Sequence, residues 1–307
     1  MKLPRQSLHL SDDSAFDLRH RYQATIEGLI EFVGTDDNGA RGTMLEAVRI
    51  AQLATKSGES TSIALSLGPF GGTLRPTQEF LGFYPPPYGP RGYTDTGENT
   101  RCFENPNDEE AAVEALAVFH FNRIMVYANN EDVWEAIRYL AFETILLPRE
   151  VTAIRKAVSM LKNQGFEKPW WISFVIPSDY PDANATEDLV KAATSPSCES
   201  PLPEGIGINC TSLQRLRSLV LRLPELVPES LKHNLLLVLY PNGGEYDEAG
   251  QCWKPRTDGD SVAWAKDFAA VLRVLVASDQ WKGVIAGGCC RTYPSHIREL
   301  RAQTREL

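Results

Sequence analysis

Two stretches decide how this sequence is interpreted: Gly207-Ile208-Asn209-Cys210-Thr211 and Gly287-Gly288-Cys289-Cys290-Arg291-Thr292. Each follows or closes a short apolar run, so we expect each to mark the point where a buried strand meets a loop. Three thiols delivered to one end of a sheet can hold a zinc ion and leave its fourth tetrahedral position open. An open position is typical of a catalytic zinc, so the pattern favours an enzyme whose substrate is itself a metal ligand.

Cysteine has a second interpretation, because buried cysteines are also common in protein cores. Adjacent cysteines alone would not decide between core filling and metal ligation. Three further cysteines, Cys102, Cys198 and Cys252, lie outside the two stretches, and we interpret them as incidental.

Working outward from these stretches, short apolar runs alternate with amphipathic segments from about residue 61 onward. The strand-like runs are 62–67, 137–142, 170–175, 205–209, 235–240 and 283–286. The helix-like segments are 108–128, 148–163, 186–193, 212–222, 259–278 and 294–302. Strands that alternate with helices predict βαβ units and a parallel sheet.

Chemistry-prone residues repeatedly follow the predicted strands. They are Gly68-Pro69-Phe70, Glu143-Thr144, Asn209-Cys210, Pro241-Asn242 and Cys289-Cys290. A (β/α) barrel keeps its active site at this end of its strands. A doubly wound open sheet has the same alternation, so periodicity alone leaves both folds open, although no glycine-rich nucleotide fingerprint follows the first strands.

Composition narrows the possible partners and compartments. The 307 residues carry a net charge of −9 and no lysine- or arginine-rich run, which argues against a nucleic-acid partner. No apolar stretch approaches the roughly 18–20 residues that span a bilayer, and residues 1–12 lack a signal-peptide core. We therefore expect a cytoplasmic protein without a membrane partner. Six cysteines fit a reducing compartment, where spaced cysteines more often indicate metal or chemistry than disulfides.

Together these motifs resemble the homocysteine S-methyltransferase family, whose members are zinc enzymes with a TIM barrel fold. Residues 66–71 (Ser-Leu-Gly-Pro-Phe-Gly) resemble the segment after the family's third strand, and Phe142-Glu143-Thr144 resembles the end of its fourth. The remaining strands are matched by 171–174, 207–211, 240–246 and 287–292, the last followed by Pro294 and His296-Ile297.

The resemblance implies an α/β fold, a TIM (β/α)8-type barrel, formed by a single homocysteine-binding domain over residues 1–307. Family members open with an Asp-Gly-Gly-x-Gly-Thr strand whose aspartate helps to hold the substrate, and no such motif occurs here. Residues 22–28 resemble the segment just after the second strand. We therefore expect the barrel to lack its first strand and most of its second, with residues 1–20 an atypical segment that forms no proper strand.

For the chemistry, the resemblance implies Zn²⁺ held by Cys210, Cys289 and Cys290, with homocysteine sulfur as the fourth ligand. Zinc removes the thiol proton, and the thiolate is the nucleophile. The implied donor is a sulfonium, S-methylmethionine or S-adenosylmethionine, and the product is methionine. A sulfonium methyl leaves without proton transfer, so we expect no catalytic residue separate from the zinc ligands.

Four residues are candidates for binding substrate: Phe70, Glu143, Asn209 and Asn242. By resemblance Glu143 binds the substrate's ammonium group, and the alternative is a surface-loop carboxylate or an acid at a helix start. Asn209 and Asn242 are expected to orient a zinc thiolate or substrate through hydrogen bonds. For Asn242 turn formation is an equal alternative, because Pro-Asn-Gly-Gly is strong turn chemistry.

Aromatic residues offer a candidate surface for a cationic donor. Phe70, Tyr84 and Tyr88 could face it through cation–π contact, although tyrosines beside prolines often just pack a loop. His120 and Arg123 share a predicted helix face, and a structural role is the favoured interpretation.

Two rival functions remain. One is a non-catalytic zinc-binding relative that has lost its N-terminal substrate anchor, which the absent Asp-Gly-Gly strand favours. The other is a barrel aldolase or hydrolase with structural cysteines. The sequence argues against it, because no barrel lysine or carboxylate pair occurs in a clear motif context.

Overall fold

The computed structural model describes residues 7–10, 24–55, 61–177, 184–197, 200–244, 246–247, 252–254 and 260–307. The chain divides into two compact units. Unit 1 comprises Met1–Ser14, Ser173–Thr194 and Glu204–Leu307, and unit 2 comprises Ala15–Ile172 and Ser195–Pro203. The expectation of a single domain over the whole chain stays a prediction.

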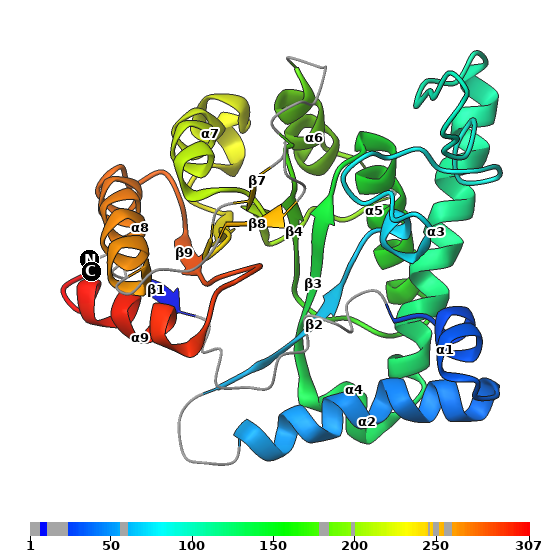
Figure 1. The fold of residues 1–307 in the computed structure, drawn as a ribbon, viewed down its shortest axis with the longest axis horizontal. Coiled ribbons are helices and arrows are strands. Elements are labelled where there is room, and N and C mark those ends of the chain that lie inside the picture. The colour runs from blue at the N-terminus through cyan, green and yellow to red at the C-terminus, as the bar shows by residue number, and fades with distance from the viewer. Residues whose placement is uncertain are drawn as a thin grey trace. The chain divides into compact units, whose positions relative to one another are not determined.

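Unit 1 is built on a parallel sheet with the strand order β1-β9-β6-β5, next to the end of β4. The strands are β1 (Ser7–Leu10), β4 (Trp170–Phe174), β5 (Gly205–Asn209), β6 (Leu236–Tyr240) and β9 (Gly283–Ala286). Its helices are α6 (Ala185–Thr194), α7 (Leu213–Leu226), the short η3 (Glu229–Leu231), α8 (Asp260–Ala277) and α9 (Pro294–Gln303). A small antiparallel pair, β7 (Tyr246–Asp247) and β8 (Cys252–Trp253), lies between β6 and α8 in the chain (Figure 1).

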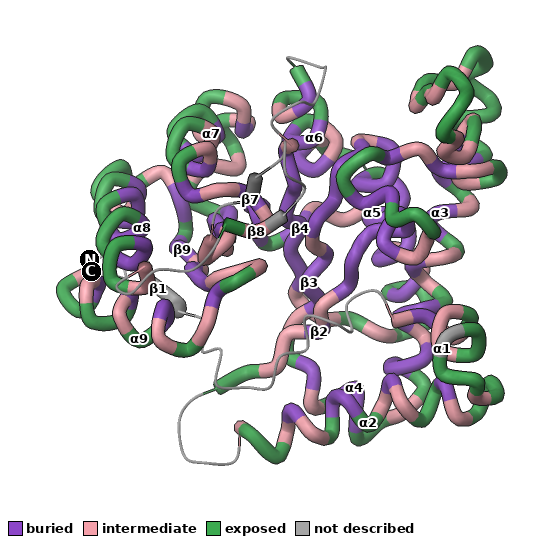
Figure 2. The backbone as a smooth tube through the Cα atoms, in the orientation of Figure 1, coloured by how far each residue is buried: buried purple, intermediate pink, exposed green. Residues whose placement is uncertain are grey.

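The register of this sheet places the ends of β5 and β9 on either side of β6. Asn209 pairs with Tyr240, and Leu239 pairs with Ala286. β5 lies so close to β6 that a side chain at Gly207 would collide with the backbone of Val238, which explains the glycine in the middle of this strand. All of β5 is buried. The same holds for β4, which Figure 2 draws in purple.

Unit 2 contains β2 (Ile63–Leu67), which pairs in parallel with β3 (Ile137–Ile145), and β4 follows β3 in the strand order. Its helices are α1 (Ile26–Val33), α2 (Asp37–Thr55), the short η2 (Phe70–Thr73), α3 (Pro106–Ala128), α4 (Glu131–Ala136) and α5 (Pro148–Asn163). The long helix α3 packs along α5 (Figure 1). Asn105 caps α3 by accepting a hydrogen bond from the Asn107 N–H, as expected of an N-cap residue.

The predicted α/β class is confirmed, and the six predicted strands correspond to β2, β3, β4, β5, β6 and β9. Among the described strands β1 and β2 each have a single neighbour, so the sheet is not closed. The N-terminal segment differs from expectation. Ser7–Leu10 form a strand that pairs in parallel with β9, whereas we expected residues 1–20 to form no proper strand; residues 11–20 lie outside the described residues.

Among the described residues, no helix is both long and apolar enough to cross a membrane.

Candidate metal centre

The structure brings together the three cysteines on which the sequence interpretation rests. Cys210 directly follows β5, and Cys289 and Cys290 follow β9 by a few residues. Because β5 and β9 both pair with β6, their carboxyl ends lie at the same edge of the sheet. The Sγ atom of Cys290 lies 3.9 Å from that of Cys210 and 4.0 Å from that of Cys289.

This cluster could hold a metal ion. All three sulfurs lie within 4.8 Å of one another, and each residue is half-buried. Four ligands placed tetrahedrally at a Zn–S bond of about 2.3 Å are separated by about 3.8 Å, so two of the three sulfur pairs already have nearly that spacing. Soft thiolate donors suit zinc, copper(I) and iron–sulfur chemistry rather than magnesium or calcium.

The three thiols also affect one another's protonation. The pKa of Cys210 is raised well above its ordinary value. The largest cause is its hydrogen bond with Cys289, and the next is its hydrogen bond with Cys290. Burial and the charges of the two other thiols add to the effect. Without a cation the Cys210 thiol therefore keeps its proton. A divalent ion reverses this preference, because its charge stabilises thiolates and its binding releases protons.

Left-handed backbone occurs at three of the candidate motifs, and also at His233 and Asp279 outside them. Cys210 has φ 49°, Thr144 after Glu143 has φ 62°, and Arg291 after Cys290 has φ 65°. Residues with a side chain rarely adopt this region. Such conformations cluster at functional sites, so their position directly at the strand-end motifs supports a functional interpretation of those motifs.

The loop after β6 connects the two cysteine stretches through its backbone. The Asn242 N–H donates to the Thr211 carbonyl at 3.0 Å, and the Gly243 N–H donates to the Cys290 carbonyl at 2.8 Å. In the other direction the Cys289 N–H donates to the Pro241 carbonyl at 2.8 Å. Turn formation, one of the two expectations for Asn242, is thus part of how the cluster is assembled.

The two asparagines differ in their surroundings. Asn209 is completely buried at the end of β5, where its carbonyl accepts the Thr211 hydroxyl at 2.9 Å. The side-chain oxygen of Asn242 is buried and has no hydrogen-bond partner among the described residues. A buried acceptor without a donor is costly, so Asn242 presents an atom that a ligand's donor would satisfy.

In unit 2, Glu143 lies within β3 and is half-buried. Its carboxylate accepts a hydrogen bond from the hydroxyl of Ser66 on β2. It is therefore neither a loop residue nor the first acid of a helix, the two alternatives to a binding role.

Phe70 opens the short helix η2 and is only 7% exposed, because three rings surround it. The centroid distances are 4.0 Å to Tyr88, 5.1 Å to Phe119 and 5.3 Å to Tyr84. Tyr84 is completely buried, and its hydroxyl donates to Glu150 Oε2 at 2.8 Å. Tyr84 thus packs and anchors its loop, which was the alternative to a donor-facing role.

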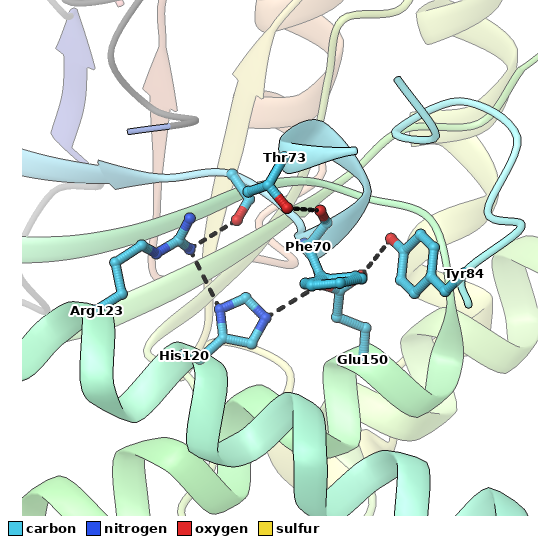
Figure 3. A network of polar contacts seen from close by, with 7 residues as sticks. Phe70, Thr73, Tyr84, His120, Arg123 and Glu150 are labelled. Carbon is cyan, nitrogen blue, oxygen red and sulfur yellow. Dashed lines mark hydrogen bonds and ion pairs between the residues drawn. The ribbon is translucent and has the colours of Figure 1, made fainter. Parts of the chain in front are cut away.

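A buried polar network lies behind Phe70, as Figure 3 shows. Glu150 Oε1 accepts the Phe70 N–H at 2.6 Å and lies 3.1 Å from His120 Nε2. Arg123 Nη2 donates to the Gly68 carbonyl at 2.7 Å and lies 3.2 Å from His120 Nδ1. This arrangement fits a neutral His120 that donates from Nε2 to Glu150 and accepts at Nδ1 from Arg123.

The pKa shifts agree with that protonation pattern. Burial lowers the pKa of His120, and burial lowers the pKa of Arg123 to about 10, which still leaves the guanidinium charged at neutral pH. Burial alone would raise the pKa of Glu150, but hydrogen bonds from His120, Phe70 and Tyr84 outweigh it and lower the pKa. The structural role favoured for His120 and Arg123 is observed. Glu150 was not singled out from the sequence, because an acid in the first turn of a helix is ordinary.

Of the cysteines interpreted as incidental, Cys102 is exposed, whereas Cys198 and the side chain of Cys252 lie outside the described parts. Glu245, within the matched stretch 240–246, also lies outside them.

The fold and the cluster together define an α/β protein with an open, barrel-type parallel sheet, in which three thiols at the strand ends could hold a metal ion. Residues 20–304 match the family model described as homocysteine S-methyltransferase, and the chain belongs to that family. It is 31% identical to homocysteine S-methyltransferase YbgG of Bacillus subtilis (strain 168) over 93% of this chain and 78% of that protein. It is 27% identical to homocysteine S-methyltransferase 4 of Zea mays over 93% of this chain and 74% of the relative.

Solved structures support the fold. The metallated form of the homocysteine methyltransferase MmuM from Escherichia coli superposes with a TM-score of 0.60 and 22% identity, covering 96% of this chain and 79% of that one. Its oxidized form gives a TM-score of 0.61 at 23% identity, with the same coverage.

Proposed function

We propose that this chain transfers a methyl group from a sulfonium donor, S-methylmethionine or S-adenosylmethionine, to homocysteine, giving methionine in a zinc-dependent reaction. The observation that carries the proposal is the cluster of Cys210, Cys289 and Cys290, whose sulfurs lie within 4.8 Å of one another. Family membership supports the acceptor, because the matching model is that of homocysteine S-methyltransferase.

In this proposal Cys210, Cys289 and Cys290 would hold Zn²⁺ as thiolates, and the homocysteine sulfur would be its further ligand. Zinc supplies a lowered thiol pKa, so that the acceptor is a thiolate at neutral pH. The thiolate sulfur then forms a bond to the donor's methyl carbon as the methyl–sulfonium bond breaks. The electron pair of that bond passes to the donor sulfur, which leaves as a neutral thioether. No proton moves in this step, so the chain needs no general acid.

The other residues bind and orient the substrates. Glu143 is assigned to the ammonium group of homocysteine, because a cation in a partly dry site needs a carboxylate partner. Asn242 is assigned to a substrate donor, supported by its unpartnered side-chain oxygen. Asn209 is assigned to orienting the Cys210 side of the cluster, and Phe70 to the donor, since aromatic rings attract sulfonium cations. The assignments of Glu143 and Phe70 rest on their motifs at the ends of β3 and β2.

A cytoplasmic location belongs to the same proposal. Its support is that Cys102, Cys210, Cys289 and Cys290 form no disulfide, which is the state that a reducing compartment maintains.

The test compares metal content and turnover in matched variants. We expect about one zinc per purified chain, lost in Cys289→Ala and retained in Cys102→Ala, a control that removes an exposed thiol outside the cluster. Methionine formation is measured with each sulfonium donor. Unchanged zinc in Cys289→Ala would refute the ligand set. Bound zinc without methyl transfer from either donor would instead favour a non-catalytic zinc-binding relative.

A further inference from the structure

A short loop connects the two halves of the thiol cluster, Cys210 on one side and Cys289 with Cys290 on the other. β5 and β9 do not pair with each other, because β6 lies between them. The loop after β6, Pro241–Gly244, therefore continues between the two cysteine-bearing turns. Its backbone makes three hydrogen bonds to them, one to Thr211 and two to the Cys289–Cys290 pair. A displacement of this loop relative to either turn would break hydrogen bonds that hold the two turns at their present separation.

This loop is held in turn by one side chain from α8. The indole Nε1 of Trp264 donates to the Asn242 carbonyl at 2.9 Å. Asn242 thus has its N–H bonded to one cysteine turn and its carbonyl bonded to Trp264. A hydrogen bond to a tryptophan is directional, since the indole has a single donor in a rigid ring.

Packing fixes the indole ring itself. Trp264 is 7% exposed and packs edge-on against Phe268, with centroids 5.3 Å apart, and against His296, also at 5.3 Å. His296 belongs to α9, which begins directly after the Cys289–Thr292 turn, and its Nδ1 accepts the Tyr293 N–H at 3.2 Å. Trp264 therefore contacts two segments. One is the loop between the two cysteine turns, and the other is the start of α9, which follows Cys289 and Cys290.

From this geometry we propose that Trp264 is a positioning residue of the metal centre, which rests on the proposed function. It acts through the Asn242 carbonyl and sets the spacing of thiols that it does not touch. A site whose ligand atoms already have the spacing that the metal requires loses little conformational entropy when the metal binds. A site whose ligands are mobile must be ordered first, which weakens binding. Removal of groups that orient ligands typically weakens metal affinity about 10–100-fold.

The test removes the indole N–H and retains an aromatic ring. Trp264→Phe is compared with Trp281→Phe, a control in the same unit: Trp281 is 2% exposed, and its indole nitrogen is buried without a partner among the described residues. The dissociation constant of Zn²⁺ is measured by chelator competition, and the cobalt(II)–thiolate absorption reports coordination geometry. We expect Trp264→Phe to bind Zn²⁺ at least about tenfold more weakly with altered cobalt absorption, and Trp281→Phe to stay within about twofold of the parent.

The possible outcomes separate the two proposals. A parent chain that binds no Zn²⁺ would refute the proposed function and this inference together. This inference alone would be refuted if Trp264→Phe bound Zn²⁺ as tightly as the parent. It would also be refuted if Trp264→Phe and Trp281→Phe were weakened equally. Should Trp264→Phe fail to fold, 3-benzothienylalanine at this position replaces the N–H by sulfur in a ring of the same shape. The same loss of affinity is expected there, and undiminished affinity would overturn the inference.

Discussion

Replacing Glu150 by glutamine tests the buried network of unit 2. The carboxylate accepts hydrogen bonds from the Phe70 N–H at 2.6 Å and the Tyr84 hydroxyl at 2.8 Å, and His120 Nε2 lies 3.1 Å away. It also interacts electrostatically with the Arg123 guanidinium, which lies on the other side of the His120 ring. Glutamine has nearly the same shape, so the change removes charge and one acceptor atom without leaving a cavity.

The size of the effect follows from burial. Glu150 and His120 are completely buried, and Arg123 is 5% exposed. Because the pKa of Arg123 is lowered only to about 10, its guanidinium remains charged at neutral pH after the carboxylate is gone. Removing one member of a buried charge pair costs about 3–5 kcal/mol. Tyr84→Phe, which removes one donor to the carboxylate, should cost less, about 2 kcal/mol.

The assay is urea denaturation near neutral pH, followed by fluorescence and circular dichroism for the parent and both variants. A loss of about 3–5 kcal/mol is a large part of the total stability of a typical domain, about 5–15 kcal/mol, so the midpoint should shift clearly. Zinc content serves as a control, because the cysteines belong to unit 1. The reasoning is refuted if Glu150→Gln loses less than about 1 kcal/mol or no more than Tyr84→Phe.

Two other predictions concern substrate and pH. Glu143→Gln should weaken homocysteine binding while zinc stays bound, and equal affinities in calorimetry would exclude the proposed ammonium contact. The metal-free protein should be most stable between mildly acidic and mildly alkaline pH. Burial lowers the pKa of His120 below its ordinary value of 6.5. Below pH 6.5 the imidazole is therefore protonated in the unfolded chain but still neutral in the folded chain, so the stability falls as the pH falls. The raised pKa of Cys210 acts oppositely: above the ordinary 9.0 the unfolded chain loses a proton that the folded chain keeps, so stability falls with rising pH. Denaturation midpoints across this range check both arms, and an alkaline arm unchanged in Cys210→Ala would exclude the thiol as its cause.

Local sequence was sufficient for the elements whose pattern is itself local. The predicted strands at 205–209 and 283–286 and the predicted helix at 148–163 have the bounds observed for β5, β9 and α5. Helices α1 and α2 were not predicted, because the predicted alternation of strands and helices begins only at about residue 61. Gly39 and Gly42 near the start of α2 are also poor helix formers. A signal was present even so: the buried residues of α2 recur at helical spacing, Ala40, Met44, Ala47, Val48 and Ala51.

Long-range pairing accounts for what the sequence could not provide. Ser7–Leu10 become a strand by pairing with β9, more than 250 residues later in the chain, and nothing within these four residues distinguishes them as a strand. The network at Glu150 depends on contacts with residues 30 to 80 positions away. Trp264 reaches Asn242 across 22 positions. The cysteines were predictable because their motifs are distinctive, although the sequence does not show that β6 brings them together.

The loops at the strand ends in both units are held by side chains from helices. In unit 1 the indole of Trp264 on α8 holds the loop after β6. In unit 2 the loop after β2 is held at the Gly68 carbonyl by Arg123 on α3 and at the Phe70 N–H by Glu150 on α5. The sheet ladder ends before these loops, so their backbone groups need other partners. Side chains on packed helices supply them and leave the loops little freedom to lose when a ligand binds. The anchors should therefore be separable: loss of the Trp264 anchor should weaken metal binding, whereas loss of the Glu150 anchor should destabilise unit 2 and leave the metal in place.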